Sequence, residues 1–103
     1  MKVKVPKKIR LCTYNYEIRL IERMASEHKL LGLCLTDDGL IKIDSGSIPQ
    51  IKDMALIHEL THAINDIFTL GLDEKTIDLL SQGWAMVLKN NLGIEFDWNM
   101  GEK

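Results

Sequence analysis

The chain has 103 residues, enough for one domain with a single hydrophobic core, and we interpret residues 1–103 as that domain. Its hydrophobic fraction of 46%, charged fraction of 27% and net charge of −2 are those of an ordinary globular protein and give no basis for a nucleic-acid partner. No segment has the apolar length of a signal peptide or of a membrane-crossing helix, so we expect a cytoplasmic protein without a membrane partner.

The N-terminal part of the chain predicts a first β-hairpin. Residues 9–13 and 16–21 each alternate apolar and polar side chains, which is the pattern of half-buried strands. Tyr14 and Asn15 separate the two runs and are the predicted two-residue turn. The polar segment at 22–29 is short, so we expect an irregular connection or a single helical turn there. A second hairpin follows, with strands at 32–36 and 40–44 on either side of Asp37-Asp38-Gly39, whose Asp-Gly step tolerates positive φ.

After residue 46 the apolar spacing changes from that of strands to that of helices. Ser47 is the predicted cap, and Pro49 suits the first helical turn because its missing N–H is not needed there, so a long helix should begin near residues 48–50. This helix must stop before Gly71. It is apolar on nearly all sides except one polar face, which is typical of a buried helix that carries a functional site.

A second helix is predicted from its N-cap, Asp73, to about Asn91. Its apolar stripe, which we expect to face the core, consists of Ile77, Leu80, Trp84, Val87 and Leu88. The sequence therefore predicts an α+β fold in which two N-terminal β-hairpins form a small, mostly antiparallel sheet. This sheet packs on the first long helix, which would be the active-site helix, and on the second, C-terminal helix.

The tail contains two large apolar side chains, Phe96 and Trp98, which a small domain has few reasons to leave in water. We expect residues 94–98 to pack back against the domain. Two outcomes are open: the tail restricts access to the functional site, or it covers the helix pair or adds a strand away from that site.

The first long helix contains the run His58-Glu59-Leu60-Thr61-His62. Residues four apart in an α-helix lie about one turn apart, so the two histidines project from one face and can bind a single metal ion. Glu59 lies about 100° further round the helix, where its carboxylate can reach a metal-bound water without becoming a ligand. This arrangement is typical of zinc-dependent hydrolases, and we predict a zinc ion as the cofactor.

A catalytic zinc ion usually has three protein ligands and one position for water, so a third ligand is needed. An HExxHxxGxxH site is excluded because the required glycine and histidine are replaced by Asn65 and Phe68. No histidine follows His62, which leaves carboxylates. The candidates are Asp66, Asp73, Glu74 and Asp78. Asp66 ranks last because it lies one turn beyond His62 on the same helix.

The run Glu74-Lys75-Thr76-Ile77-Asp78 resembles the Glu-x-x-small-Asp sequence of the gluzincins, HExxH metallopeptidases whose third zinc ligand is a glutamate on the next helix. It differs in having isoleucine at the small position. Leu80-Ser81 is similar to the apolar and small pair that follows this glutamate in the compact ImmA/IrrE-type peptidases. Over its whole length the chain looks like the small phage- and prophage-encoded metallopeptidase-type proteins.

This resemblance implies a minimal metallopeptidase that acts on a peptide or protein substrate in the cytoplasm, which is that of the host cell if the chain is phage-encoded. His58, His62 and Glu74 would bind zinc, and Glu59 would be the general base. Asp78 would orient a histidine through a hydrogen bond.

Two geometric expectations follow from the resemblance. Twelve positions separate His62 from Glu74, fewer than in the large gluzincins. Glu74 reaches the metal only if the first helix ends near residues 66–68, and otherwise Asp78 is the closer carboxylate. The strand at residues 40–44 is expected at an open edge of the sheet, beside a cleft facing the histidines, where it would bind extended substrate as an added strand.

A second hypothesis is a non-catalytic zinc-binding module with a regulatory or protein-interaction role, in which the metal stabilises a small fold. Four protein ligands would favour this module, whereas three ligands plus water would favour the enzyme. The sequence assigns no residue to oxyanion stabilisation. Tyr14, Tyr16 and His28 have suitable side chains, but we expect each of them to be structural.

Overall fold

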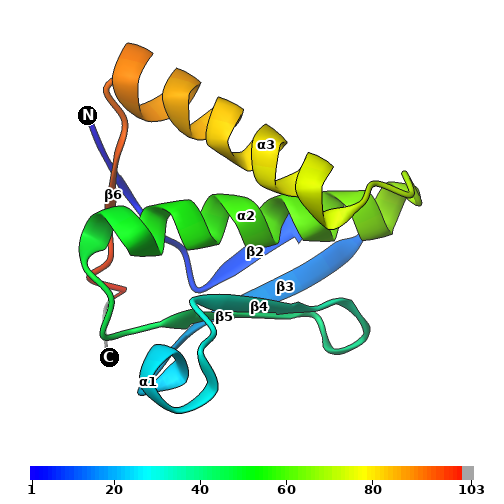
Figure 1. The fold of residues 1–103 in the computed structure, drawn as a ribbon, viewed down its shortest axis with the longest axis horizontal. Helices are drawn as coiled ribbons and strands as arrows, with labels where there is room; N and C mark the ends of the chain where they lie inside the picture. The colour runs from blue at the N-terminus through cyan, green and yellow to red at the C-terminus, as the bar shows by residue number, and fades with distance from the viewer. Residues whose placement is uncertain (101–103) are drawn as a thin grey trace.

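The computed structural model describes residues 1–100, which have the α+β fold expected from the sequence (Figure 1). A four-stranded sheet has the order β2-β3-β5-β4, and two of its three pairings are antiparallel. Two long helices lie on one side of this sheet, with α2 between the sheet and α3 (Figure 1). The four strands are β2 (Lys8–Leu11), β3 (Tyr14–Ile21), β4 (Gly32–Leu35) and β5 (Leu40–Asp44).

The first hairpin is present, but its turn lies two residues earlier than predicted. Leu11 of β2 pairs with Tyr14 of β3, so the turn consists of Cys12 and Thr13. Cys12 has a φ of 57°, which gives this tight turn its left-handed residue. The predicted turn residues, Tyr14 and Asn15, are both exposed but belong to β3, where they pair with Leu11 and Arg10.

The second hairpin is confirmed, and its turn is a short 3-10 segment, η1 (Thr36–Asp38), followed by Gly39 at a φ of 60°. Its second strand is not at the edge of the sheet. β5 pairs with β4 on one side and in parallel with β3 on the other, so the predicted edge position of residues 40–44 is wrong. The reason is burial: Ile41 and Ile43 have no exposed surface, which favours the centre of the sheet. The edge strand of this hairpin is β4, and β2 is at the other edge of the sheet.

The connection before β4 forms one short helix, α1 (Met24–His28), as expected. The carboxylate of Asp44, at the end of β5, accepts hydrogen bonds from the Ala25 backbone N–H at 3.2 Å and from the Ser47 hydroxyl at 2.7 Å. Because Ser47 is engaged there, it does not cap α2, and that prediction is wrong. Helix α2 (Pro49–Phe68) begins with Pro49 at the predicted first-turn position and has Ile48 as its N-cap.

Helix α3 (Glu74–Ala85) begins as predicted. The side chain of Asp73 caps it by accepting a hydrogen bond from the Thr76 N–H at 2.8 Å. The helical path continues as a π-helical segment, η2 (Met86–Asn91), so it reaches the predicted end near Asn91.

The apolar stripe predicted for α3 is confirmed at Ile77 and wrong at Leu80, Trp84 and Val87. The buried residues are Ile77, Ser81 and Ala85, whereas Trp84 is 56% exposed and Leu80 is 44% exposed. Ser81 and Ala85 are small, and small side chains let two helices approach closely, so the close contact with α2 runs along them rather than along the larger side chains. Leu80 and Trp84 instead line a shallow apolar hollow of about 290 Å³ between α2 and α3.

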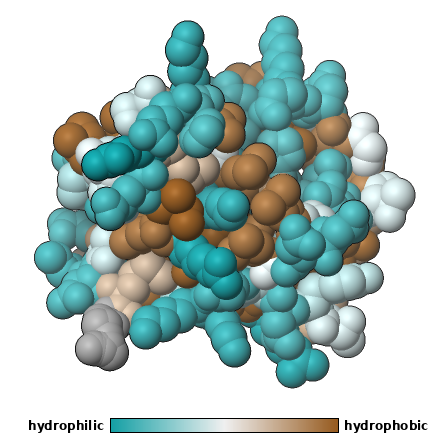
Figure 2. Space-filling view, turned by 90° about the horizontal axis from the view of Figure 1, so that it is seen from below, coloured by the Kyte–Doolittle hydropathy of each residue, from teal (hydrophilic) through white to brown (hydrophobic). Residues whose placement is uncertain are grey.

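The hydrophobic core lies between the sheet and α2. The sheet contributes Tyr16, Ile18, Ile41 and Ile43, and the helix contributes Ala55, Leu56 and Ala63. On the opposite face of the sheet, hydrophobic side chains form a band between hydrophilic ones (Figure 2). No helix in the described residues is both long enough and apolar enough to cross a membrane.

The tail packs back on the domain, as expected. Strand β6 (Glu95–Asp97) pairs in parallel with β1 (Lys2–Lys4), which makes a separate two-stranded sheet at the end of the molecule where the chain begins (Figure 1). Phe96 and Trp98 are partly buried against the core. The indole Nε1 of Trp98 donates a hydrogen bond to the buried carboxylate of Asp53 on α2 at 2.6 Å, which ties the tail to the first half of that helix.

Candidate metal centre

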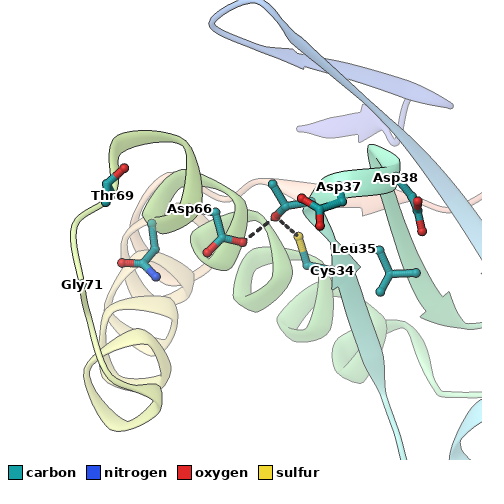
Figure 3. Close-up of a pocket in the computed structure, with 9 residues that line it drawn as sticks. Cys34, Leu35, Asp37, Asp38, Asp66, Thr69 and Gly71 are labelled. Carbon is teal, nitrogen blue, oxygen red and sulfur yellow. Dashed lines mark hydrogen bonds between the residues drawn. The ribbon is translucent and has the colours of Figure 1, made fainter.

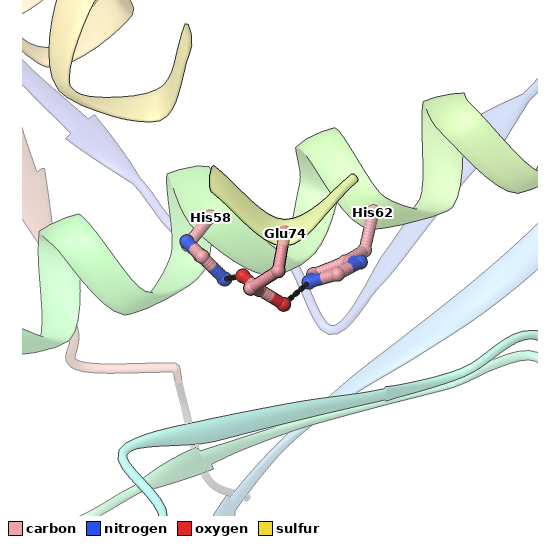
Figure 4. Close-up of side chains that lie close together, drawn as sticks. All are labelled: His58, His62 and Glu74. Atoms are coloured by element: carbon pink, nitrogen blue, oxygen red, sulfur yellow. Dashed lines mark hydrogen bonds and ion pairs between the residues drawn. The ribbon is translucent and has the colours of Figure 1, made fainter. Parts of the chain in front are cut away.

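The three residues His58, His62 and Glu74 converge on one point (Figure 4). The two imidazole rings lie one turn apart on α2, with their centroids 4.9 Å apart. Glu74 reaches down from the first turn of α3 and places one carboxylate oxygen 2.9 Å from His58 Nε2 and the other 3.0 Å from His62 Nε2. Two nitrogens and a carboxylate therefore meet at the polar face of the helix.

The position of Glu74 depends on how α2 ends. The helix stops at Phe68, six residues or about 9 Å beyond His62, within the range that the sequence required. Thr69 adopts a left-handed φ of 52°, which turns the chain out of the helix. The Asn65 side chain then accepts a hydrogen bond from the Leu72 N–H at 2.9 Å, which holds the connection back against α2. Glu74 follows directly and reaches both histidines.

The donor set fits a divalent metal ion. All three groups offer atoms within 4.8 Å of one another. Tetrahedral coordination with bonds of about 2.0–2.1 Å separates ligand atoms by roughly 3.3 Å. The contacts of 2.9 and 3.0 Å, which involve different oxygens of Glu74, would open slightly, and the wider separations, which reach at most 4.8 Å, would close. Glu74 is 66% exposed on its side chain and is free to make this adjustment. Two imidazoles and one carboxylate suit zinc and also several other divalent ions.

Of the other carboxylates considered from the sequence, Asp78 is the nearest to the site. It lies one turn beyond Glu74 on α3, and its Oδ1 is 3.7 Å from His58 Nδ1, the ring nitrogen that faces away from Glu74. A carboxylate in this position favours the tautomer in which Nε2 is the free ligand atom. Asp73 is occupied as the cap of α3.

Asp66 is directed away from the two histidines. It accepts a hydrogen bond from the Thr36 hydroxyl, and Thr36 also contacts Cys34, so these side chains connect the last turns of α2 to the second hairpin (Figure 3). They line a cavity of about 820 Å³ at that end of the molecule. Among the described residues, only the histidine and Glu74 group brings three potential metal ligands together.

Glu59 lies on the side of α2 that faces the sheet, next to the two histidines in sequence. It is 8% exposed, and burial raises the pKa of its carboxyl group above the usual value because the ionised form loses its solvation. The Glu74 carboxylate acts in the same direction, whereas His58 and His62 lower the pKa when they carry a positive charge. A buried carboxylate beside a metal site is the usual environment of a general base.

A cavity of about 560 Å³ opens beside His58 and Glu59, between α2 and the start of the edge strand β4. Its apolar lining is formed by Leu30, Leu31, Ile51, Met54 and Ala55. None of the residues that line it belongs to the described part of the tail, so the structure favours the packing role of residues 94–98 over restricted access. Tyr14, Tyr16 and His28 do not line it either.

Two residues that shape the site were not assigned a role in it from the sequence. Asn65 holds the loop before Glu74, and Gly32 lies against Glu59. The signal for Asn65 was local, since asparagine often bonds to a nearby backbone where a helix ends. The role of Gly32 could not be recognised from the sequence, because a glycine at the start of a strand is explained equally well by the turn before it.

Comparison of the chain with protein-family models, with curated proteins and with solved structures finds no match in any of the three.

Proposed function

We propose that this protein is a minimal zinc-dependent metallopeptidase. The observation that carries the proposal is the convergence of His58 Nε2, His62 Nε2 and the Glu74 carboxylate beside the buried carboxylate of Glu59. Three protein ligands leave one coordination position for water, which is the arrangement of catalytic rather than structural zinc sites.

The chain supplies each further group that amide hydrolysis needs, apart from a dedicated oxyanion donor. A bound zinc ion would provide Lewis acidity, which lowers the pKa of water and polarises a carbonyl group. Glu59 would take a proton from the attacking water and return it to the leaving amine. Asp78 would hold the ring of His58 in the orientation that directs Nε2 to the metal.

The edge strand β4 supports a peptide as the substrate. It pairs with β5 on one side and ends the sheet on the other, so an extended chain can add to it as a fifth strand. The strand begins with Gly32, which lies against Glu59, and a peptide bound there would pass the candidate metal centre. Because β5 is not at the edge of the sheet, we assign to β4 the binding of extended substrate that the sequence suggested for residues 40–44.

We expect cleavage next to a large apolar residue, because the cavity beside His58 and Glu59 has an apolar lining. Mass-spectrometric profiling of a peptide library with the zinc-loaded protein should show enrichment of leucine, isoleucine, phenylalanine or methionine at one position adjoining the cleaved bond. Leu31→Ser should lower kcat/KM for the best peptide by roughly tenfold. The matched control is Leu79→Ser, since Leu79 is similarly exposed but lies on α3 outside this cavity. Enrichment of charged residues would contradict the expectation.

The direct test of the proposal is Glu59→Gln. Glutamine keeps the size of the side chain and cannot act as a base, so peptide cleavage should fall by at least about 100-fold while zinc affinity stays within about threefold of wild type. Cleavage and zinc content are measured on the same samples. The peptidase assignment is wrong if zinc-loaded wild-type protein cleaves nothing in the library, or if the variant cleaves as fast as wild type.

The alternative, a non-catalytic zinc-binding module, predicts a different coordination shell. A structural ion would have a fourth protein ligand, and Asp78, whose Oδ1 lies 3.7 Å from His58 Nδ1, could move to supply it. X-ray absorption of the zinc-loaded protein, compared with Asp78→Asn, separates the two functions. Under the peptidase proposal the coordination number and the zinc content do not change in the variant.

A further inference from the structure

Of the described glycines without a positive φ angle, Gly32, Gly46 and Gly83, only Gly32 would bring an added Cβ atom within 3.4 Å of another residue. Gly39, Gly71 and Gly93 have positive φ angles between 60° and 69°, a backbone conformation that favours glycine. Gly32 has no such angle and begins a β-strand, where glycine weakens the structure because it has no side chain to pack. Its backbone conformation is therefore open to other residues, and the reason for glycine lies in its surroundings.

The surroundings of Gly32 are filled by Glu59. A Cβ atom at position 32 would lie 3.0 Å from Glu59 Cγ and 3.2 Å from Glu59 Oε2. The third neighbour, Ile43 Cδ1, would be 3.3 Å away. All three contacts are tighter than the 3.4–4 Å of ordinary van der Waals contact. Gly32 pairs with the fully buried Ile43, so the side of the strand that faces α2 is already packed around this point.

The carboxylate of Glu59 thus rests on the bare backbone of the edge strand. A methyl group at position 32 would have to displace the Glu59 side chain, the tip of Ile43, or the strand itself. Glu59 is 8% exposed and borders the cavity of about 560 Å³, so a displaced carboxylate would shift toward that cavity and away from its present position. A catalytic group that shifts by about 1 Å loses roughly 100-fold in rate, so even a modest displacement matters to a general base.

We propose that Gly32 is a positioning residue whose missing side chain leaves the space that the Glu59 carboxylate occupies against the edge strand. The proposal deepens the assignment of Glu59 as the base and rests, for its catalytic consequence, on the proposed function. Gly32 itself takes no part in the chemistry. It sets the distance between the carboxylate and the strand along which the peptide binds.

The kinetic test is Gly32→Ala. We expect kcat for the best library peptide to fall by roughly 10- to 100-fold, while KM and zinc affinity each stay within about threefold of wild type. The metal ligands are unchanged, and one added methyl group takes up little of the cavity of about 560 Å³ that Gly32 lines. Gly83→Ala is the matched control: an added Cβ meets nothing within 4 Å there, and activity should not change. Retention of kcat within twofold in Gly32→Ala would overturn the proposal, as would a loss due to zinc release.

A second measurement needs no activity. The unfolding equilibrium constant is measured in denaturant for wild type, Gly32→Ala, Glu59→Ala and the double variant, which makes a double-mutant cycle. Gly32→Ala should raise the constant by roughly tenfold when Glu59 is present and by less than twofold when Glu59 is alanine, because both close Glu59 atoms are then gone.

The two measurements separate the two proposals. Equal effects of Gly32→Ala in both backgrounds would show that Glu59 does not fill this space, and the inference would fail whatever the protein cleaves. Strong coupling in a protein that cleaves no peptide would instead support the proposed contact between Gly32 and Glu59 and contradict the proposed peptidase function.

Discussion

His58→Ala and His62→Ala are each expected to abolish stoichiometric zinc binding at micromolar protein. The two imidazoles are the only nitrogen ligands in the group, and Glu74 alone cannot replace either of them. Four-ligand zinc sites bind with roughly 10–16 kcal/mol, or about 2.5–4 kcal/mol per ligand. Loss of one histidine should therefore weaken zinc binding by roughly 100- to 1,000-fold. The protein should stay folded, because both rings lie at the edge of the core rather than inside it.

The measurement is elemental analysis of zinc after equilibration and dialysis, with a competing chelator to obtain the dissociation constant. His28→Ala is the matched control, since His28 is an exposed residue of α1 and does not belong to the group. Glu74→Gln should lie between the histidine variants and this control, because an amide oxygen is a weaker ligand than a carboxylate. Equal zinc content in wild type and in both histidine variants would remove the metal centre and the proposed function with it.

The candidate site could be predicted from the sequence where its geometry is local. The spacing of His58 and His62 fixes both rings on one face of a helix, whatever that helix packs against. Asp73 followed by Glu74 is a local N-cap signal, and the structure has that cap. The contact between Glu74 and the histidines was conditional, because it depends on the residue at which α2 ends. The left-handed conformation of Thr69 decides this, and threonine rarely signals such a turn.

The arrangement of the strands could be predicted only in part. Each hairpin is a local structure and was found, although the first turn is at Cys12 and Thr13. The parallel pairing of β3 with β5 joins residues more than twenty positions apart, and alternation of side chains does not specify the partner of a strand. For this reason the edge position was assigned to β5, although β4 has it.

The exposed position of Trp84 has a related cause. Apolar periodicity identifies the apolar side of a helix but not the line along which two helices touch. In α3 that line follows Ile77, Ser81 and Ala85, because small residues allow the closest approach to α2. Two of these residues carry little hydrophobic signal, so the larger Leu80 and Trp84 dominated the pattern.

Substitution of Asp53 is expected to have the largest effect on the free energy of unfolding. Its carboxylate is 3% exposed and accepts hydrogen bonds from the ammonium group of Lys89 and from the indole of Trp98. Lys89 also lies over the ring of Phe96, with Nζ 5.3 Å from its centroid. One buried carboxylate on α2 thus contacts the last helical segment and the tail that follows it, 36 and 45 residues further along the chain.

Asp53→Ala is expected to lower the free energy of unfolding by about 3–5 kcal/mol, because it leaves the partly buried Lys89 ammonium without its counter-charge. For a domain of this size the melting temperature should fall by roughly 12 °C or more. Scanning calorimetry of the metal-free protein measures both. The matched control is Arg19→Ala, which removes a solvent-exposed ion pair with Glu17 and should leave the melting temperature nearly unchanged.

The double variant Asp53→Leu with Lys89→Met tests whether the loss comes from an unpaired charge. Replacing both members of a buried pair with apolar side chains of similar size is often close to neutral, whereas removing one member leaves the other desolvated and uncompensated. Most of the lost stability should therefore return in the double variant, even though Trp98 still lacks its acceptor. If Asp53→Ala melts within about 3 °C of wild type, or if the double variant is as unstable as the single one, the buried pair does not hold the tail against α2.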